Sequence, residues 1–212
     1  MAMPETAAAG ETVYQLRVVL AEISPLIWRR LQITGSTTLA DLHQILQTAF
    51  GWDDDYLHAF TIHGVEYGTT GGCHTSGAGV RLDTLGLRER ERLIYTHNFF
   101  AGWRHDLRVE QIGPAHPKRH YPRCLAGALR VPPEECDGPD AYLQLRAEQP
   151  FAVLRMAEIL GELLDEHLDQ RLNDIPDLRD ELRQLVVYGR LDDFDRTAVN
   201  QALSALQTQR RA

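Results

Sequence analysis

The residues of this chain that could do chemistry are histidines and carboxylates, which together can move protons in general acid–base catalysis. Four of them could form a cleft near the basic stretch 104–130: His58, His105, Glu134 and Glu135. We take these four as candidate catalytic residues. A structural interpretation stands beside this one, because a histidine within a strand is typical of a half-buried residue bonded to a carbonyl, and carboxylates after two prolines are typical of a first helical turn.

A second grouping has the atoms that zinc prefers. Histidines and cysteines in the middle of the chain could supply four ligands, namely His116, His120, Cys124 and Cys136, with Cys73 and His74 farther away. The first three recur every four residues and would align on a helix, but Pro117 and Pro122 argue against a helix there. No Cys-x-x-Cys pair is present. We therefore expect no cofactor and no metal, and keep these four residues as the alternative ligand set.

Three consecutive acids, Asp53–Asp55, could also hold a hard cation. Consecutive side chains point in different directions, however, unlike the alternating ligands of a calcium loop. We interpret them as a solvated turn.

Arginines gather between residues 104 and 130, where six basic residues face only Asp106 and Glu110. The candidate binding residues here are Trp103, Arg104, Arg108, Arg119 and Arg123, and a solvated loop with scattered bases is the alternative. The whole chain carries a formal charge of −8, all of which comes from residues 133–212. Proteins that bind duplex nucleic acid normally carry a basic excess. We expect another protein or a small ligand as the partner, with nucleic acid left open only at 104–130.

Other features exclude several classes of protein. No apolar run approaches the roughly 20 residues of a membrane span, and no phosphate loop, dinucleotide fingerprint or nucleophile elbow occurs. The first ten residues lack the regions of a signal peptide, and three cysteines are too few for a disulfide framework. These features predict a cytoplasmic protein that does not enter a membrane.

The first half of the chain alternates between strand and helix patterns. Apolar residues at period two predict strands over 13–21, 26–33, 57–63, 92–99 and 104–112. An apolar stripe at helical spacing predicts a helix from Leu39 to Phe50, capped by Thr38 and ended by Gly51. The predicted fold is α+β: β-β-α-β and then a β-hairpin, in an antiparallel or mixed sheet with a helix on one face. Because residues two apart share a face of a strand, Trp103, His105 and Leu107 should all point toward that helix.

The rest of the chain changes character. Six of the ten prolines lie in residues 113–139, which predicts an irregular crossing segment over 113–138. Helical stripes follow in 139–149, 151–168, 178–186 and 199–206. We expect residues 1–12 to form a disordered leader and residues 13–212 a single domain, with a sheet-rich core over 13–112 and a helical part over 139–212.

Four stretches together resemble one known family. They are Ile23-Ser24-Pro25-Leu26-Ile27-Trp28-Arg29-Arg30, Phe50-Gly51-Trp52 with Leu57-His58-Ala59-Phe60, Trp103-Arg104-His105, and Tyr121-Pro122-Arg123-Cys124-Leu125-Ala126-Gly127 followed by Pro132-Pro133-Glu134-Glu135. In order and spacing they are similar to the plasmid pRiA4b ORF-3-like family, which includes passenger proteins of insertion elements. The resemblance implies an α+β fold with no assigned activity.

The chain departs from the family pattern at three positions. Asn98 and Ala101 replace two aspartates that family members often carry before the Trp-x-His motif, and Val131 replaces a cysteine before Pro-Pro-Glu. If those acids or that thiol did chemistry, this chain has lost part of it.

Two functional hypotheses remain. The first is a non-catalytic binding or adaptor module linked to mobile genetic elements, since the recurring residues are mainly Trp, Pro, Gly and Leu. The alternative is a hydrolase or nuclease-like enzyme with a His/Glu cleft beside the basic stretch 104–130. Convergence of the four candidate catalytic residues in one pocket would favour the enzyme.

Overall fold

A computed structural model describes residues 10–68, 75–134, 136–164, 185–186 and 191–209 of the chain. The elements in chain order are β1 (Thr12–Leu20), β2 (Trp28–Thr34), α1 (Leu39–Phe50), β3 (His58–Ile62), β4 (Val65–Gly68), β5 (Thr75–Ser76), the 3-10 turn η1 (Leu82–Thr84), β6 (Arg92–His97), β7 (Trp103–Pro114), β8 (Arg123–Ala128), α2 (Gly138–Leu164) and α5 (Arg196–Gln209).

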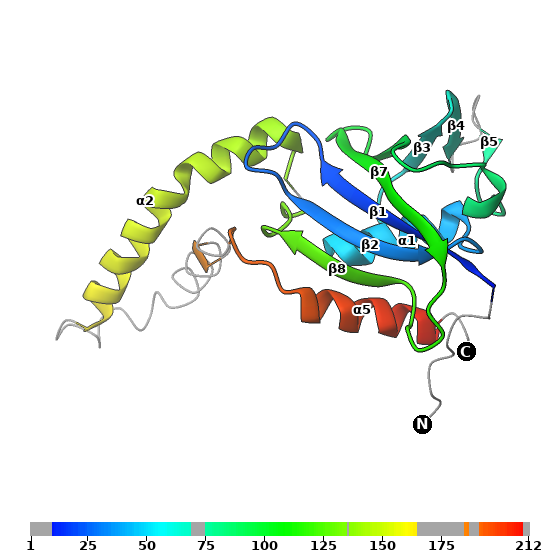
Figure 1. Ribbon diagram of the computed structural model, residues 1–212. Helices are drawn as coiled ribbons and strands as arrows, with labels where there is room; N and C mark the ends of the chain where they lie inside the picture. The colour runs from blue at the N-terminus through cyan, green and yellow to red at the C-terminus, as the bar shows by residue number, and fades with distance from the viewer. Residues whose placement is uncertain (1–9, 69–74, 135, 165–184, 187–190, 210–212) are drawn as a thin grey trace.

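The strands form one mixed sheet in the order β5-β4-β3-β6-β7-β1-β2-β8. The pair β4–β5 is parallel and every other pair is antiparallel. Helix α1 lies across one face of the sheet, and the opposite face of the central strands is turned toward the viewer in Figure 1. The predicted α+β class, with a helix on one face, is confirmed.

Helix α1 begins and ends as its sequence predicts. The Thr38 side chain accepts from the Asp41 backbone N–H, and the Asp41 carboxylate accepts from the Thr38 backbone N–H, which completes a capping box. Gly51 ends the helix with φ 69°, the left-handed conformation in which glycine is least strained. The apolar stripe of α1 is buried against the sheet, and His43 and Gln47 are buried with it.

The central strands alternate between the two faces of the sheet. On β7, Trp103, His105 and Leu107 are at most 1% exposed, whereas Arg104 and Arg108 face solvent. The His105 ring contacts the Phe50 ring edge-on, with centroids 4.8 Å apart. The predicted orientation of Trp103, His105 and Leu107 toward α1 is therefore confirmed.

The segment 113–138 is less irregular than its prolines predict. Strand β7 runs to Pro114, and residues 123–128 form β8, which pairs with β2 at the sheet edge. Residues 123–128 include three small residues, so their sequence does not show the apolar alternation that predicts a strand. Pro122 precedes the strand and does not interrupt its hydrogen bonds. The irregular path is confined to the loops on either side of β8.

The helical part also differs from the prediction. Residues 138–164 form one helix, α2, through Pro150, where a break was expected. An interior proline removes one backbone hydrogen bond and crowds the preceding turn, which can bend a helix without ending it. The start of α2 packs on the core through Tyr142, and the rest projects away from the sheet (Figure 1).

Helix α5 packs on α1 and β8. The Asn200 side chain accepts from the Cys124 backbone N–H at 2.8 Å and donates to the Cys124 carbonyl at 3.0 Å. Asn200 thus satisfies backbone groups of the edge strand. Residues 1–9 of the predicted leader over 1–12, most of the predicted stripe at 178–186, and Cys73 and His74 lie outside the described residues, whereas Thr12 already belongs to β1.

None of the helices in the described part of the chain combines the length and apolar composition needed to cross a bilayer.

Replacing Trp103 with Ala should cost about 3–5 kcal/mol of unfolding free energy, because it removes a fully buried ring from the core. Replacing Arg104 should cost well under about 1 kcal/mol, since its ion pair with Asp106 is exposed. Chemical denaturation of both variants measures the difference. Equal, small effects would contradict the packing described for Trp103.

Candidate functional site

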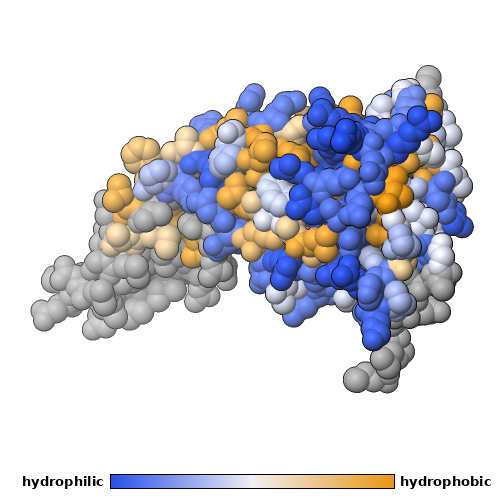
Figure 2. All heavy atoms as spheres, viewed as in Figure 1, coloured by the Kyte–Doolittle hydropathy of each residue, from blue (hydrophilic) through white to orange (hydrophobic). Residues whose placement is uncertain are grey.

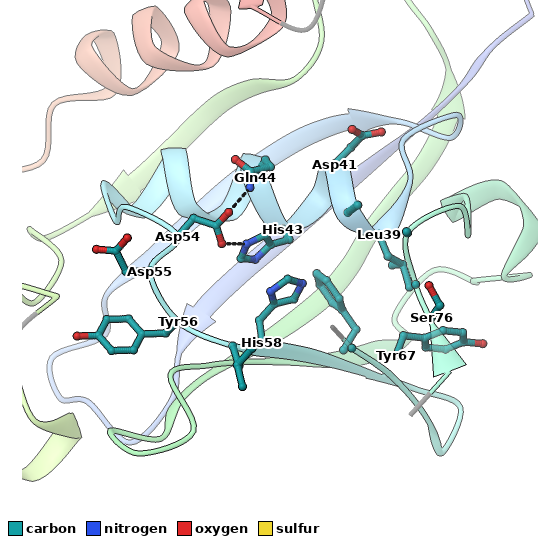
Figure 3. A pocket seen from close by; sticks show the side chains of 16 residues that line it. Leu39, Asp41, His43, Gln44, Asp54, Asp55, Tyr56, His58, Tyr67 and Ser76 are labelled. Carbon is teal, nitrogen blue, oxygen red and sulfur yellow. Dashed lines mark hydrogen bonds and ion pairs between the residues drawn. The ribbon is translucent and has the colours of Figure 1, made fainter. Parts of the chain in front are cut away.

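A cleft of about 850 Å³ opens between α1 and strands β3 and β4 (Figure 3). Its walls come from the first two turns of α1, the loop that joins α1 to β3, the start of β3, and residues 76–78. Three side chains that can bind a metal or move a proton meet on one side of it: His43, Asp54 and His58.

His43 is held in the cleft wall by hydrogen bonds to both ring nitrogens. Its side chain is 3% exposed. Nδ1 lies 2.7 Å from the buried Tyr95 hydroxyl, which also receives a hydrogen bond from Gln47 Nε2 at 2.7 Å. Nε2 contacts Asp54 Oδ1. Tyr95 therefore orients the ring so that Nε2 is turned toward the cleft.

Asp54 comes from the loop after α1, where its φ of 62° is rare for a residue with a side chain. This conformation turns the carboxylate back onto α1. Its second oxygen accepts from Gln44 Nε2 at 2.5 Å. The carboxylate is 40% exposed, so it also faces the cleft.

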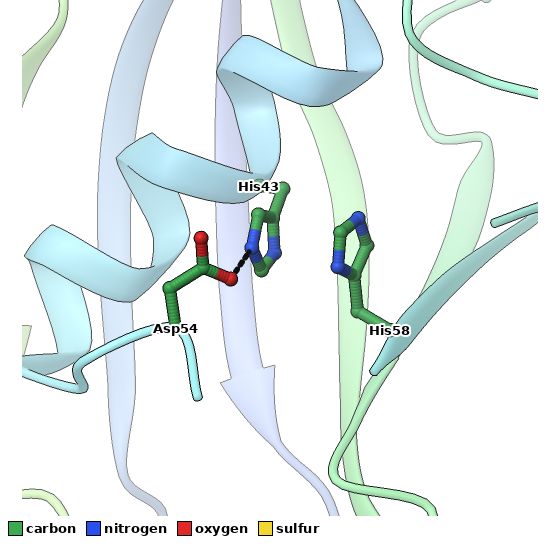
Figure 4. A group of neighbouring side chains, drawn as sticks. All are labelled: His43, Asp54 and His58. Carbon is green, nitrogen blue, oxygen red and sulfur yellow. Dashed lines mark hydrogen bonds and ion pairs between the residues drawn. The ribbon is translucent and has the colours of Figure 1, made fainter. Parts of the chain in front are cut away.

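His58 is the first residue of β3, and its ring stacks on that of His43 with centroids 3.5 Å apart and an interplanar angle of 8° (Figure 4). Burial, and then the neighbouring His43, lowers the pKa of His58 to about 4. Burial also lowers the pKa of His43, although Asp54 opposes this effect. Both imidazoles are neutral at pH 7, which is the form that binds metals.

The arrangement suits metal binding better than proton transfer. A general-base histidine needs one nitrogen for its orienting carboxylate and the other for the substrate. In His43 the second nitrogen is bonded to buried Tyr95, so it cannot reach a substrate. Ligand atoms of His43, Asp54 and His58 all lie within 4.8 Å of one another. An ion with bonds of about 2.0–2.2 Å would draw them closer.

The three candidate catalytic residues that the structure describes, His58, His105 and Glu134, do not converge. His58 lines the cleft, whereas His105 is 1% exposed and packs among Phe50, Trp52 and Tyr95. Glu134 lines a different cleft, and Glu135 lies outside the described residues. The Glu134 carboxylate accepts from the Asp53 backbone N–H at 2.7 Å and pairs with the buried His97 at 3.1 Å. Glu134 therefore ties the 53–55 loop to the core.

The candidate binding residues divide into two groups. Trp103 is fully buried and cannot contact a ligand at the surface, so its assignment as a binding residue is corrected. Arg104 and Arg108 lie on the open face of the sheet, and Arg123 follows on β8. Arg119 lies in the loop before β8 beside a small pocket.

The alternative zinc ligands are not gathered. Among the residues that the structure describes, the group of histidine, cysteine and acidic side chains within ligand reach is the one at the α1–β3 cleft. His116 and His120 are exposed in the loop before β8, Cys124 is buried on β8, and Cys136 lies near the start of α2.

The departures from the family pattern lie in turns and core rather than in the cleft. Asn98 is buried with φ 51°, and its side-chain oxygen accepts from the backbone N–H groups of Phe100 and Ala101. An aspartate could accept the same bonds. Val131 is 8% exposed and packs in the core.

Sequence reasoning missed two of the three cleft residues. His43 stands four residues after Leu39 and three before Leu46, which places it on the buried face of α1. A histidine on an otherwise apolar helix face was the available signal. Asp54 was interpreted as part of a solvated turn, because nothing local shows that its backbone folds back onto α1.

Comparison with known proteins now places this fold. A family model described as "Plasmid pRiA4b ORF-3-like protein" matches residues 12–149. The chain belongs to the pRiA4b ORF-3-like family. The match covers the whole sheet and all three cleft residues, so the cleft lies within the family's own region of the chain.

Relatives of this pRiA4b ORF-3-like chain support the fold. It is 28% identical over 136 residues to the uncharacterized protein y4hQ of Sinorhizobium fredii (strain NBRC 101917 / NGR234), covering 62% of this chain and 70% of that protein. It is similar to the crystal structure of a protein of unknown function, MM3350, from Methanosarcina mazei Go1, with a TM-score of 0.64 and 26% identity over 88% of this chain and 96% of that one.

Buried His105 should make the stability of the protein depend on pH. Burial lowers its pKa from 6.5 to about 3, so only the unfolded chain takes up this proton between those values. Stability is therefore full above pH 6.5 and falls with pH by about 1 kcal/mol per unit from this group. Replacing His105 with Gln should reduce the slope between pH 6.5 and 4.5, measured by urea unfolding. His120→Gln at the surface is the control variant, and equal slopes for the two variants would contradict the prediction.

Proposed function

We propose that this protein is a binding module whose α1–β3 cleft holds a divalent transition metal ion through His43, Asp54 and His58. The observation that carries the proposal is the convergence of two neutral imidazoles and one carboxylate at the wall of an open cleft. Two histidines and a carboxylate are a common ligand set for zinc, and also for iron(II).

The surroundings of His43 support this role. Metal-binding histidines usually donate their other ring N–H to a fixed acceptor. With Nε2 on an ion, the Nδ1–H of His43 would be donated to the Tyr95 oxygen at 2.7 Å. The buried side-chain oxygen of Gln47 has no hydrogen bond to any described residue. If the Gln47 side-chain amide flips, this oxygen can accept a hydrogen bond from the Tyr95 hydroxyl.

Binding would require both imidazole rings and Asp54 to move. A metal ion lies in the plane of each imidazole that binds it, so the two parallel rings must tilt toward a common point. Asp54 must exchange its hydrogen bond with His43 for the ion, and its loop position and 40% exposure leave room for this exchange.

A second candidate function is hydrolysis by a water molecule bound to the same ion. Three protein ligands leave the fourth position of a tetrahedral zinc ion open. Catalytic zinc sites keep this position for a water molecule. The cleft has a volume of about 850 Å³, which admits a substrate beside the ion. The binding-module hypothesis and the hydrolase hypothesis thus share one site. They differ in whether the bound ion catalyses the hydrolysis of a substrate.

The setting of the protein is inferred from other features. Cys124 and Cys136 are both free thiols, which supports a reducing, cytoplasmic compartment. The family takes its description from a plasmid reading frame, which supports a role connected with mobile genetic elements.

Replacing Asp54 with Asn should weaken Zn²⁺ binding by on the order of 10–100-fold, because the anionic ligand is lost. Asp55→Asn is the matched control, since Asp55 lines the same cleft but lies outside the ligand group, and it should bind Zn²⁺ as the unchanged protein does. Isothermal titration calorimetry measures the affinities, and Co²⁺ absorption reports the ligand field. Equal affinities for both variants would refute the metal site.

Turnover separates the two functions. The Zn²⁺-loaded protein is assayed on a panel of carboxyl and phosphate esters with the same two variants. Hydrolysis that is lost in Asp54→Asn and kept in Asp55→Asn would establish the enzyme. Tight Zn²⁺ binding without turnover on any ester would support the binding module.

A further inference from the structure

A row of four arginines crosses the face of the sheet opposite α1. Arg17 on β1 pairs directly with Arg30 on β2 and with Arg108 on β7, and Arg108 pairs with Arg92 on β6. Directly paired residues of antiparallel strands share a face, so the four side chains stand in line across β6, β7, β1 and β2. Neighbouring strands are about 4.8 Å apart, which gives the row a length of roughly 15 Å.

The row is electrostatically unfavourable in the free protein, because like charges placed directly opposite each other destabilise a sheet. Only Arg30 has an ion pair with a described residue, Glu110. Arg17 Nε is buried and has no hydrogen-bond partner among the described residues. The Glu110 carboxylate attracts both Arg30 and Arg17 and offsets part of the repulsion, whereas no described carboxylate forms an ion pair with Arg92 or Arg108.

The wider face is also basic. Across the five strands from β6 to β8 the outward charged residues are six arginines and two carboxylates: Arg17, Arg30, Arg92, Arg104, Arg108 and Arg123 against Asp106 and Glu110. The acidic excess of the chain lies in residues 133–212 and does not reach this face. Hydrophilic side chains gather over these strands, with apolar side chains beside them (Figure 2).

A second row runs beside the arginines and begins with an apolar pair. Trp28 pairs with Val19, both half-buried, Val19 pairs with Asp106, and Asp106 pairs with the half-buried Ile94, so the Asp106 carboxylate separates Ile94 from Trp28 and Val19. The guanidinium groups of Arg17 and Arg30 lie 5.1 and 5.4 Å from the centre of the Trp28 ring. These contacts hold both cations in place beside the aromatic surface.

We propose that this face binds single-stranded nucleic acid, with phosphates along the row Arg30–Arg17–Arg108–Arg92 and bases against Trp28 and Val19. Proteins that bind single strands without sequence preference combine a basic track with apolar or aromatic surface. A single strand can lay its unstacked bases on an aromatic side chain such as Trp28, whereas the bases of a duplex are stacked on one another and offer only their edges. The proposal does not depend on the metal site, which lies on the α1 side of the sheet.

Fluorescence anisotropy with a labelled oligo(dT) of about 20 nucleotides tests the proposal at low salt, in the presence of EDTA. The double variant Arg17→Gln/Arg108→Gln should bind at least tenfold more weakly. Its plot of log K against log salt should be shallower by about 1.4, since each phosphate contact with a single strand contributes about 0.7. The variant should melt at the same temperature as the unchanged protein or higher, because a repulsion is removed.

Arg81→Gln/Arg130→Gln is the matched control. It makes the same change in net charge on the side of α1, where Arg81 forms a backbone bridge with the helix cap residue Thr38 and a side-chain ion pair with Asp83, and Arg130 lines the cleft beside α5. This variant should bind oligo(dT) within about twofold of the unchanged protein.

Tryptophan fluorescence gives a second readout. Trp52 and Trp103 are at most 6% exposed, so quenching by oligo(dT) should come from Trp28 and disappear in Trp28→Phe. Equal losses in the two double variants, or no binding at low salt, would overturn the proposal. So would binding of heparin or anionic vesicles as tight as that of oligo(dT) without Trp28 quenching, because it would show a general affinity for polyanions.

Discussion

The buried hydroxyl of Tyr95 sets how α1 lies on the sheet. Helix α1 buries His43 and Gln47 together with its apolar stripe, and buried polar atoms need partners. The hydroxyl oxygen of Tyr95, on β6, is hydrogen-bonded to His43 Nδ1 and to Gln47 Nε2, each at 2.7 Å. A rotation of α1 that broke these bonds would leave three polar groups unsatisfied in the core. The same contact turns Nε2 of His43 toward the cleft, so the packing of the fold and the geometry of the site have one cause.

The loop between α1 and β3 completes the site from the other side. Trp52 donates to the Pro132 carbonyl at 3.0 Å, and Glu134 accepts from the Asp53 backbone, so the start of this loop is tied to the segment after β8. Asp54 follows in a left-handed conformation that places its carboxylate on His43. The family motif residues Trp52, Pro132 and Glu134 therefore act on the cleft indirectly, by fixing the loop that carries Asp54.

The two faces of the sheet have different chemistry for a simple reason. Successive side chains of a strand point to opposite faces, so each central strand supplies both the core under α1 and the open surface. On the covered side, burial excludes charge from His105 and His58, whose pKa values fall to about 3 and about 4. On the open side, the antiparallel register lines up arginines that are far apart in the chain. The net charge of −8 conceals this basic surface, because the acids lie mainly in residues 133–212.

The sequence alone determined the α+β class, helix α1 with both its caps, and the inward direction of Trp103, since these depend on local periodicity and on neighbouring residues. It also contained the family motifs. Only the tertiary structure decided which titratable groups meet. His58 and His43 are stacked because β3 passes beneath α1, Asp54 joins them through its own backbone conformation, and the arginine row exists only in the paired register of four strands. Such contacts join residues that are distant in sequence, and no local pattern specifies which strand lies beside which.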